Sequence, residues 1–226
     1  MLPGASMSGF KGNSQAIAVI VSSSQNNINL FTVCSSPLGA GTYTITINAG
    51  VTIGSLVSTT AAIVTGTFPS GSIVNLVVNG SVLAKEGAGG GSDLIGNAGG
   101  HAISCSGDIN ISGAGVIKGG GGGGGGGSTT LGTDANGTSY SAPGGQGGDG
   151  QGFGNPGGPS AGAVGSTVTS PDGQSSVTGG AGFSGGAYGA AGAAGGYGGP
   201  GAAGNAVKKN GYTVNVAGPT TTGAVS

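Results

Sequence analysis

The chain has no Trp and no Arg, and charged residues make up only 5% of its 226 positions. Its five scattered Lys side chains cannot neutralise a track of phosphates, so nucleic acid is excluded as a partner. No apolar run approaches the ~20 residues that cross a bilayer, and no charged start precedes an apolar core as in a signal peptide. We therefore expect neither membrane insertion nor a signal peptide.

Chemically reactive side chains are also scarce. Two cysteines, Cys34 and Cys105, are too few for a disulfide framework, and the sequence leaves open whether they pair. His101 is the only histidine, and a pair with Cys105 would lack a third, orienting group. Asp134-Ala-Asn136-Gly137 begins like a calcium loop but lacks the closing acid, and the glycine run 119–127 lacks the Gly-Lys-Ser/Thr ending of a phosphate loop. These absences predict a protein that is not an enzyme and holds no metal or cofactor.

Glycine is what the chain has in excess. There are 59 glycines, most of them between Gly87 and Gly204, with nine in succession at 119–127. Glycine loses more conformational entropy on folding than any other residue and brings no side chain to bury. A chain this rich in glycine is either disordered or held together by an unusual packing of backbone against backbone.

The first part of the chain, up to about residue 86, is β-like. β-branched residues alternate or run together in short stretches that are separated by Gly, Asn, Ser and Pro. These stretches are Ala16–Val21, Ile28–Val33, Tyr43–Ile47, Val51–Ile53 and Ile73–Leu83. A short strand, a glycine corner and a second short strand recur at intervals of roughly 30 to 35 residues, which indicates stacked units. A β-solenoid or a twisted β-sandwich would satisfy this pattern, and almost no α-helix is expected.

A second repeat brackets the glycine-rich region. The stretch from Gly99 to Gly113, with Ala102-Ile103 and Ile109-Asn-Ile111, resembles the stretch from Gly204 to Gly218, with Ala206-Val207 and Val214-Asn-Val216. The end of the chain therefore looks like another unit of the β part. The glycine-rich region is then a long excursion whose two ends return to the same scaffold, which argues against a linker.

Glycines within the excursion follow a period of three. Every third residue from Gly186 to Gly204 is glycine, and Gly144, Gly147 and Gly150 form another such frame. Three residues per turn is the period of the polyproline II helix, whose backbone groups point outward and must find partners in neighbouring chains. This favours a bundle of polyglycine-II helices with the nine glycines at its most enclosed position. Disorder is the alternative reading, and collagen is disfavoured because the frame slips and Pro is sparse.

These patterns predict a mainly β protein with four parts. Residues 1–27 are an N-terminal attachment segment, and 28–118 are a β-repeat base, solenoid or sandwich. Residues 119–204 form the polyglycine-II bundle with its loops, and 205–226 are a closing β segment packed on the base.

The order of these elements resembles a known family. Several stretches, in this order, are similar to the glycine-rich ends of bacteriophage tail fibres and central tail-tip proteins. They are the run Thr42–Gly54, the stretch from Gly66 through Asn79-Gly80, the glycines at 87–91, the polyglycine run and the closing stretch 211–226. The glycine-rich part is also similar to the tip adhesins of T-even-type phages. The resemblance implies a virion component, extracellular after lysis of the host. Its partners would be other fibre or tail proteins, a host surface protein or glycan, and further copies of itself in a possible homotrimer.

In that family, loops between glycine segments contact the host, and they would correspond here to Ser128–Pro143, Gln146–Pro159 and Ser166–Thr178. The aromatic residues near the loops are either binding anchors or wedges between glycine segments, and we place Tyr140 and Phe153 among the anchors. The residues expected to contact a receptor are Asp134, Asn136, Tyr140, Gln146, Asp149, Phe153, Asp172 and Gln174. A structural fibre or decoration protein that assembles through its glycine-rich surface is an alternative, and an ice-binding protein is a second.

Overall fold

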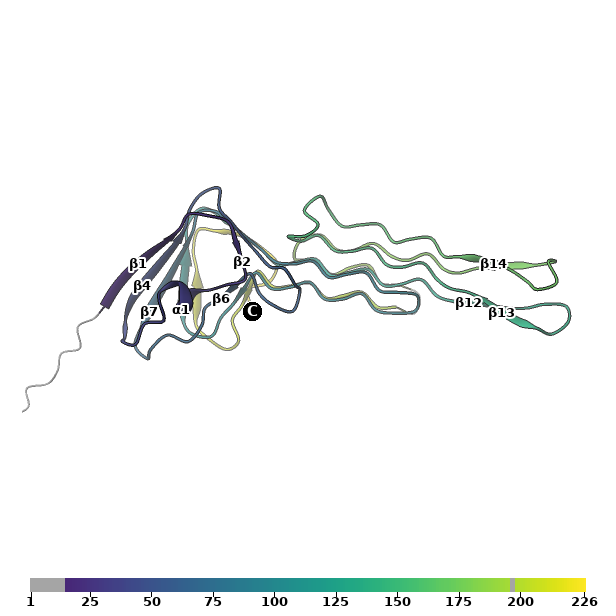
Figure 1. The fold of residues 1–226 in the computed structure, drawn as a ribbon, viewed down its shortest axis with the longest axis horizontal. Helices are drawn as coiled ribbons and strands as arrows, with labels where there is room; N and C mark the ends of the chain where they lie inside the picture. The colour runs from purple at the N-terminus through teal and green to yellow at the C-terminus, as the bar shows by residue number, and fades with distance from the viewer. Residues whose placement is uncertain (1–14, 196–197) are drawn as a thin grey trace, which may run out of the picture.

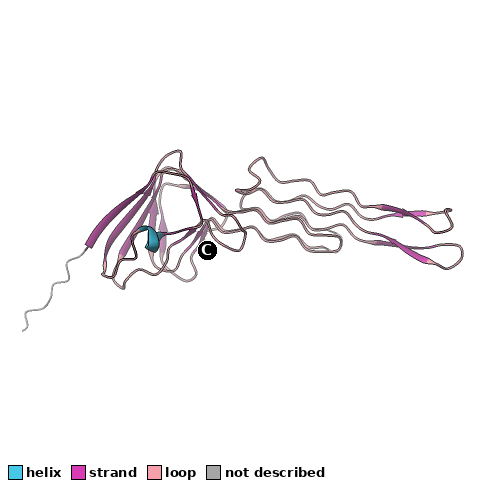
Figure 2. Cartoon of the chain, viewed as in Figure 1, coloured by secondary structure: helices cyan, strands magenta, loops and turns pink. Residues whose placement is uncertain are grey.

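The computed structural model describes residues 15–195 and 198–226. They form a β-structured base from which a long glycine-rich bundle extends to a tip made of two β-hairpins (Figure 1). Most of the bundle contains neither helix nor strand, and strands reappear at its far end (Figure 2). Residues 1–14, the first half of the expected attachment segment, lie outside the described residues.

The base is a parallel β-solenoid, because three sheets share the strands of successive coils and every strand pair within them is parallel. We call the sheets A, B and C in the order in which each coil visits them. Sheet A contains β1 (Gln15–Val21), β4 (Gly41–Ile47), β7 (Ile73–Val78), β10 (Ile109–Ser112) and β17 (Val214–Val216). Sheet B contains β2 (Gln25–Asn26), β5 (Thr52–Gly54), β8 (Ser81–Leu83), β11 (Val116–Lys118) and β18 (Thr220–Thr222). Sheet C contains β3 (Ile28–Asn29), β6 (Ile63–Val64), β9 (Ile103–Ser104) and β16 (Val207–Lys208).

Alternation along the strands fills the interior of the solenoid. In β4 the sequence GTYTITI places every second residue in the core, so that Tyr43, Ile45 and Ile47 are fully buried. The parallel register then places aliphatic side chains of successive coils on top of one another, as in the column Ile45, Leu76 and Ile111 of sheet A. Sheets B and C contribute similar columns, with Ile53 beside Val82 and Ile63 beside Ile103.

One predicted β stretch is partly wrong. The run Ile28–Val33 gives strand only at Ile28–Asn29, after which Leu30–Val33 form α1, the one helix among the described residues. Asn29 caps this helix, since its Oδ1 accepts hydrogen bonds from the N–H groups of Phe31 (3.0 Å) and Thr32 (3.4 Å). Within the described part of the chain, no helix has the length and apolar character to cross a bilayer.

The internal repeat predicted from sequence is confirmed by the strand register. Ile103 pairs with Val207, Ile109 with Val214, and Asn110 with Asn215. On the outer face of sheet A this register builds an asparagine ladder. Asn215 Nδ2 donates to Asn110 Oδ1 (2.9 Å), and Asn110 Nδ2 donates to Asn75 Oδ1 (3.0 Å).

Both glycine-rich excursions leave the base at one corner, between sheets B and C. The corner holds only Asn27 in the first coil, and residues 55–62, 84–102 and 119–206 in the next three. Both glycine-rich excursions therefore start and end side by side. This placement brings 84–102 against the polyglycine run, and its carbonyl and N–H groups bond to it throughout.

Backbone hydrogen bonds of the nine glycines repeat every three residues. The N–H groups of Gly120, Gly123 and Gly126 donate to the carbonyls of Gly100, Asn97 and Leu94. The next frame, Gly121, Gly124 and Gly127, donates to 145–151, and the third frame donates to Thr222, Ala190 and Ala193. Their carbonyls accept, again at intervals of three, from N–H groups of 87–93, 183–189 and 201–204. The run is thus surrounded by backbone on all sides, and residues 119–127 are all buried.

This environment leaves no room for side chains. A Cβ atom built on any residue of 119–127 would come closer than 3.0 Å to the backbone of a neighbouring segment. At Gly123 the obstacle is the Ala88 carbonyl, and at Gly126 it is that of Gly91. Close approach of backbones, rather than freedom of the φ angle, therefore explains the glycines here.

The two cysteines are both buried and free. Burial raises the pKa of the Cys105 thiol to about 11 and also raises that of Cys34. They act as small apolar side chains of the core.

Candidate functional site

The end of the molecule farthest from β1 consists of two antiparallel hairpins, which we call the tip (Figure 1). The first hairpin is β12 (Thr130–Thr133) and β13 (Ser139–Ala142), and the second is β14 (Thr167–Thr169) and β15 (Ser176–Thr178). They occupy the predicted loops Ser128–Pro143 and Ser166–Thr178. The sequence predicted the exposed position of these loops but not their strands.

Asp134 organises the turn of the first hairpin. Its Oδ1 accepts hydrogen bonds from the N–H groups of Asn136 (2.9 Å) and Thr138 (2.7 Å), and only 7% of the residue is exposed. Gly137 takes a positive φ of 80°, which this tight turn requires. Asp134 is therefore a framework residue whose carboxylate is occupied within the turn.

Asp172 has the same role in the second hairpin. Its carboxylate accepts from the Ser170 hydroxyl, from the N–H of Gln174 (3.0 Å) and from the N–H of Ala135 (3.3 Å). These bonds, the Ser170 hydroxyl first, lower the pKa of Asp172 below its ordinary value. Since Ala135 belongs to the first turn, Asp172 also ties the two hairpins together.

A second contact between the hairpins involves Tyr140. Its hydroxyl lies 2.8 Å from the Ser175 hydroxyl, and its ring covers Gly132, where a Cβ atom would collide with it. The two hairpins therefore form one surface instead of two independent loops. Asn136 and Gln174 project from this surface and are exposed.

An apolar residue at the tip was missed by the sequence reasoning. Leu131 in β12 is 78% exposed, although it lies in an otherwise polar stretch. A single Leu among Ser, Thr, Gly, Asp and Asn was the available signal. An exposed leucine on a rigid surface is a candidate contact for a partner.

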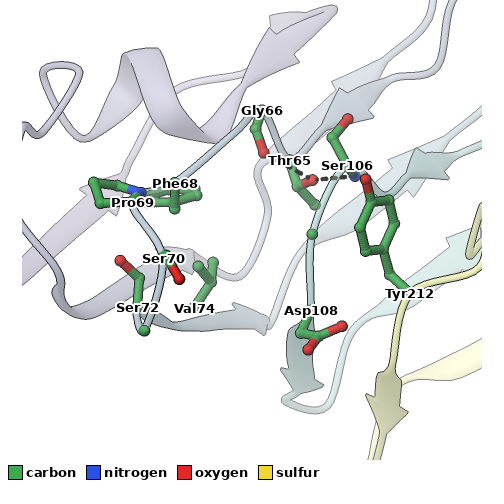
Figure 3. Close-up of a pocket in the computed structure, with 12 residues that line it drawn as sticks. Thr65, Gly66, Phe68, Pro69, Ser70, Ser72, Val74, Ser106, Asp108 and Tyr212 are labelled. Carbon is green, nitrogen blue, oxygen red and sulfur yellow. Dashed lines mark hydrogen bonds between the residues drawn. The ribbon is translucent and has the colours of Figure 1, made fainter.

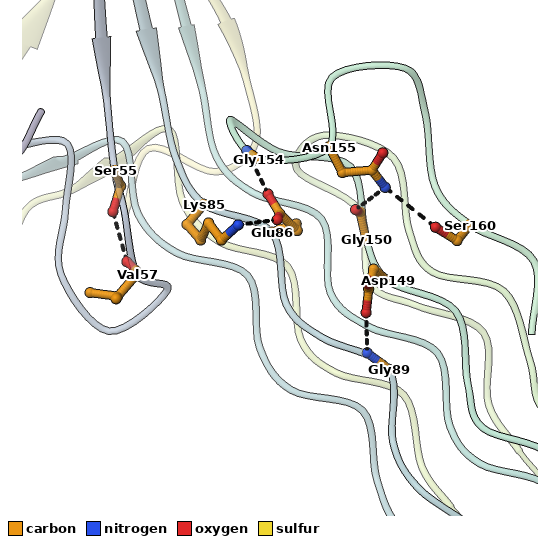
Figure 4. A network of polar contacts seen from close by, with 10 residues as sticks. All are labelled: Ser55, Val57, Lys85, Glu86, Gly89, Asp149, Gly150, Gly154, Asn155 and Ser160. Carbon is orange, nitrogen blue, oxygen red and sulfur yellow. Dashed lines mark hydrogen bonds and ion pairs between the residues drawn. The ribbon is translucent and has the colours of Figure 1, made fainter. Parts of the chain in front are cut away.

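Two other predicted residues lie on the side of the bundle, away from the tip hairpins. Gln146 and Asp149 are exposed on the segment that returns from the first hairpin. Asp149 Oδ1 accepts a hydrogen bond from the N–H of Gly89 (2.9 Å), which joins two glycine segments (Figure 4). Asp149 thus contributes to the bundle framework.

Phe153 lies at the junction of bundle and base. Its N–H donates to the Ala84 carbonyl (2.8 Å), and its ring lies over Gly54 of β5, where a Cβ atom would overlap the ring. The next residue, Gly154, donates its N–H to Glu86 Oε2 (2.9 Å), and Glu86 is paired with Lys85 (Figure 4). The structure therefore does not bring Phe153 together with the tip residues.

The chemistry of the tip is that of a binding surface. It offers amides, hydroxyls, an aromatic hydroxyl and one exposed aliphatic side chain. Among residues 15–195 and 198–226, no group of His, Cys, Asp and Glu side chains is placed to hold a metal ion. Small polar groups with rigid aromatic and apolar contacts are typical of protein surfaces that recognise a partner.

Comparison with known proteins agrees with this interpretation. A search of curated proteins finds no match. Among solved structures, the chain is similar to one from the gp37-gp38 adhesin tip complex of the long tail fibre of bacteriophage S16, with a TM-score of 0.59 and 22% sequence identity over 95% of this chain and 84% of that one. The family model described as phage tail fibre adhesin Gp38 matches residues 16–225. The chain therefore belongs to the Gp38 family of phage tail fibre adhesins, which are receptor-binding proteins and not enzymes.

Proposed function

We propose that this adhesin contacts the host receptor through the two hairpins of its tip, with Asn136, Gln174, Tyr140 and Leu131 as the main contacts. The observation that carries the proposal is the pair of bonds between the hairpins, Ala135 to Asp172 and Tyr140 to Ser175, which hold exposed side chains in one fixed surface. A pre-ordered surface loses little conformational entropy on binding. The receptor is a host surface protein or glycan, and virion location at the fibre tip follows from the family.

The glycine-rich region supports the tip as a rigid rod. We infer that 119–204, together with 84–102, is a bundle of polyglycine-II helices. The three-residue period of the hydrogen bonds around 119–127 and the absence of space for any Cβ atom there support this inference. Such a rod needs no side-chain core, because all nine N–H groups of 119–127 and eight of their carbonyls bond to other described segments.

The base would join the adhesin to its fibre. The similar S16 protein is described in complex with gp37, and we infer an equivalent fibre protein as the partner of this chain. β1 is the edge strand of sheet A, at the opposite end of the molecule from the tip (Figure 1). Residues 28–118 and 205–226 then form the scaffold, and the N-terminal residues up to 27 belong to the attachment end.

Paired glutamine variants test the tip against the side of the bundle. Gln174→Ala, combined with Asn136→Ala, removes exposed tip amides, whereas Gln146→Ala removes an equivalent amide from the bundle side. Truncation of side chains at the centre of an interface costs more than about 1 kcal/mol each, or at least about fivefold in affinity. We expect the tip variant to lose binding to host cells and the Gln146 variant to keep it, measured with labelled adhesin at equal folded concentration. An equal loss of host-cell binding in both variants would show that the receptor contacts the side of the bundle and would contradict the proposal.

A further inference from the structure

A pocket on the side of the base is built from stacked corners of the solenoid. It lies at the corners between sheets C and A, and has a volume of about 250 Å³. The loop after β6 supplies Phe68 and Pro69, the loop after β9 supplies Asp108, and the loop after β16 supplies Tyr212. Figure 3 shows Phe68 and Pro69 on one side of the pocket, Tyr212 on the other, and Asp108 between them. This pocket is remote from the tip and takes no part in the proposed receptor contact.

The walls of the pocket are fixed before any ligand binds. Ser106 N–H donates to the Thr65 hydroxyl (2.7 Å), and Thr213 N–H donates to Asp108 Oδ1 (2.8 Å). Phe68 is held by aromatic contacts with Phe31 and Tyr43, at 5.5 and 4.9 Å between ring centres. A cavity with walls fixed in this way is typical of a binding site for a small ligand.

Two polar groups in the pocket are not fully hydrogen-bonded. Asp108 uses Oδ1 for Thr213, and its Oδ2 receives no hydrogen bond from the described residues. Ser72 Oγ is the one buried side-chain polar atom of the described residues that lacks a hydrogen-bond partner. A buried hydroxyl without a partner, such as that of Ser72, is rare in native proteins, and one explanation is a ligand or water that completes it. Asp108 is exposed, so its Oδ2 is open to a ligand.

The pocket continues into a second compartment of about 240 Å³ along the outer face of sheet A. Ser72 and Asp108 line both compartments, and the second adds Asn110 and Asn215 of the asparagine ladder. The combined groove offers a carboxylate, amides and hydroxyls along its length. At one end lies Tyr212, a residue that is 42% exposed. Neither compartment is lined by Lys, Arg or His, which disfavours phosphates and other anions.

We propose that this groove binds a neutral saccharide of one or two rings from the host cell surface. Sugar hydroxyls would donate to Asp108 Oδ2 and share bonds with Ser72 Oγ and the asparagine amides, and an apolar ring face would lie against Tyr212. A charged acceptor and pairs of amides suit a ligand with many hydroxyl groups, and an aromatic ring suits its C–H face. The base would then hold surface polysaccharide while the tip contacts its receptor, and the two sites together would add avidity.

Saturation-transfer NMR on the full chain tests the proposal, with the methyl glycosides of glucose, galactose and N-acetylglucosamine as probes and butylamine as a cationic probe. We expect signal transfer to at least one glycoside. Tyr212→Ala should weaken binding about tenfold, the loss expected for one aromatic contact. Asp108→Asn should also weaken it about tenfold, the loss expected for one charge-assisted hydrogen bond, while the Asn oxygen still accepts from Thr213. Transfer to no glycoside, transfer to butylamine alone, or undiminished transfer in both variants would overturn the proposal.

Two serine variants separate binding from folding. Ser72→Ala removes an unpartnered hydroxyl, so the melting temperature should stay equal or rise while glycoside binding falls. Ser139→Ala removes an exposed hydroxyl of the tip and should leave glycoside binding unchanged. If Ser72→Ala binds glycosides as well as the original chain, the orphaned hydroxyl has no part in the site and the proposal fails. Because the tip variants do not touch the groove, failure of the receptor-contact proposal would leave this result unaffected.

Discussion

A single methyl group inside the glycine bundle should be among the most disruptive changes available to this chain. Gly123 donates its N–H to the Asn97 carbonyl (2.9 Å) and accepts from the Gly201 N–H (2.8 Å). A Cβ atom at this position would overlap the Ala88 carbonyl, which is backbone and cannot rotate away. In Gly123→Ala the surrounding segments must therefore separate.

The magnitude follows from the groups that are disturbed. Overpacking of a filled interior costs about 1–3 kcal/mol, and each buried backbone group that loses its partner costs about 1–3 kcal/mol more. With two bonds at Gly123 strained or broken, we expect Gly123→Ala to lower the free energy of unfolding by about 3–9 kcal/mol. That is a large share of the ~5–15 kcal/mol that stabilises a typical domain. At about 2–4 °C per kcal/mol for a chain of this length, the melting temperature should fall by roughly 6–36 °C.

Gly157→Ala is the matched control. Gly157 is exposed, and no atom lies within 4 Å of the position of its Cβ. The substitution should change stability by less than about 0.5 kcal/mol. Amide hydrogen exchange read separately over 84–102, 119–206 and the base would locate the effect. Equal protection of the bundle in Gly123→Ala and Gly157→Ala would refute the close-packing argument.

Further predictions concern the tip, the cysteines and the junction. Because the folded-state pKa of Asp172 is depressed, the stability that it adds is present above the unfolded pKa and is lost as pH falls through the folded pKa. A pH titration followed by NMR should show the Ala135 amide shifting below about pH 4. Cys34 and Cys105 should resist a thiol reagent at pH 8 in the folded protein and react fully in denaturant, since both are buried and neutral there; rapid labelling of the native chain would contradict this. Phe153→Ala should lower the free energy of unfolding by about 3 kcal/mol through lost packing, and with it the melting temperature, and leave host-cell binding unchanged in the folded variant. Weaker host-cell binding without a change in stability would indicate that Phe153 contacts the receptor.

Local patterns predicted much of the base. β-branched alternation located β1, β4, β5, β7 and β8, and the repeat between 99–113 and 204–218 anticipated the register of Ile103 with Val207. The sequence missed β6 (Ile63–Val64) of sheet C and β2 (Gln25–Asn26) of sheet B, because stretches of two residues are too short to show a period. Helix α1 escaped because the cap at Asn29 interrupts an apolar run that reads equally well as strand.

The candidate site was predicted only in outline, for a physical reason. A run of nine identical glycines carries no information about which neighbour each one contacts, and the contacts join segments far apart in the chain. The sequence therefore could not show that Phe153 returns to Gly54 of the base, or that Ala135 and Asp172 meet at the tip. Turn-forming Asp and Gly residues indicated exposed loops, and tertiary contacts decided which loops share a surface.

The three-residue rhythm around 119–127 limits how this adhesin can change in length. Adding one or two residues to a single segment would turn its N–H groups away from their carbonyls and expose the wrong faces to its neighbours. Adding a triplet to every outgoing and returning segment would restore each contact and, in the polyglycine-II geometry that we propose, move the tip outward by about 9 Å. With the proposed tip contact and fibre attachment, the distance from fibre to receptor can change only in discrete steps that several segments take together. The hairpins at the end can vary one residue at a time.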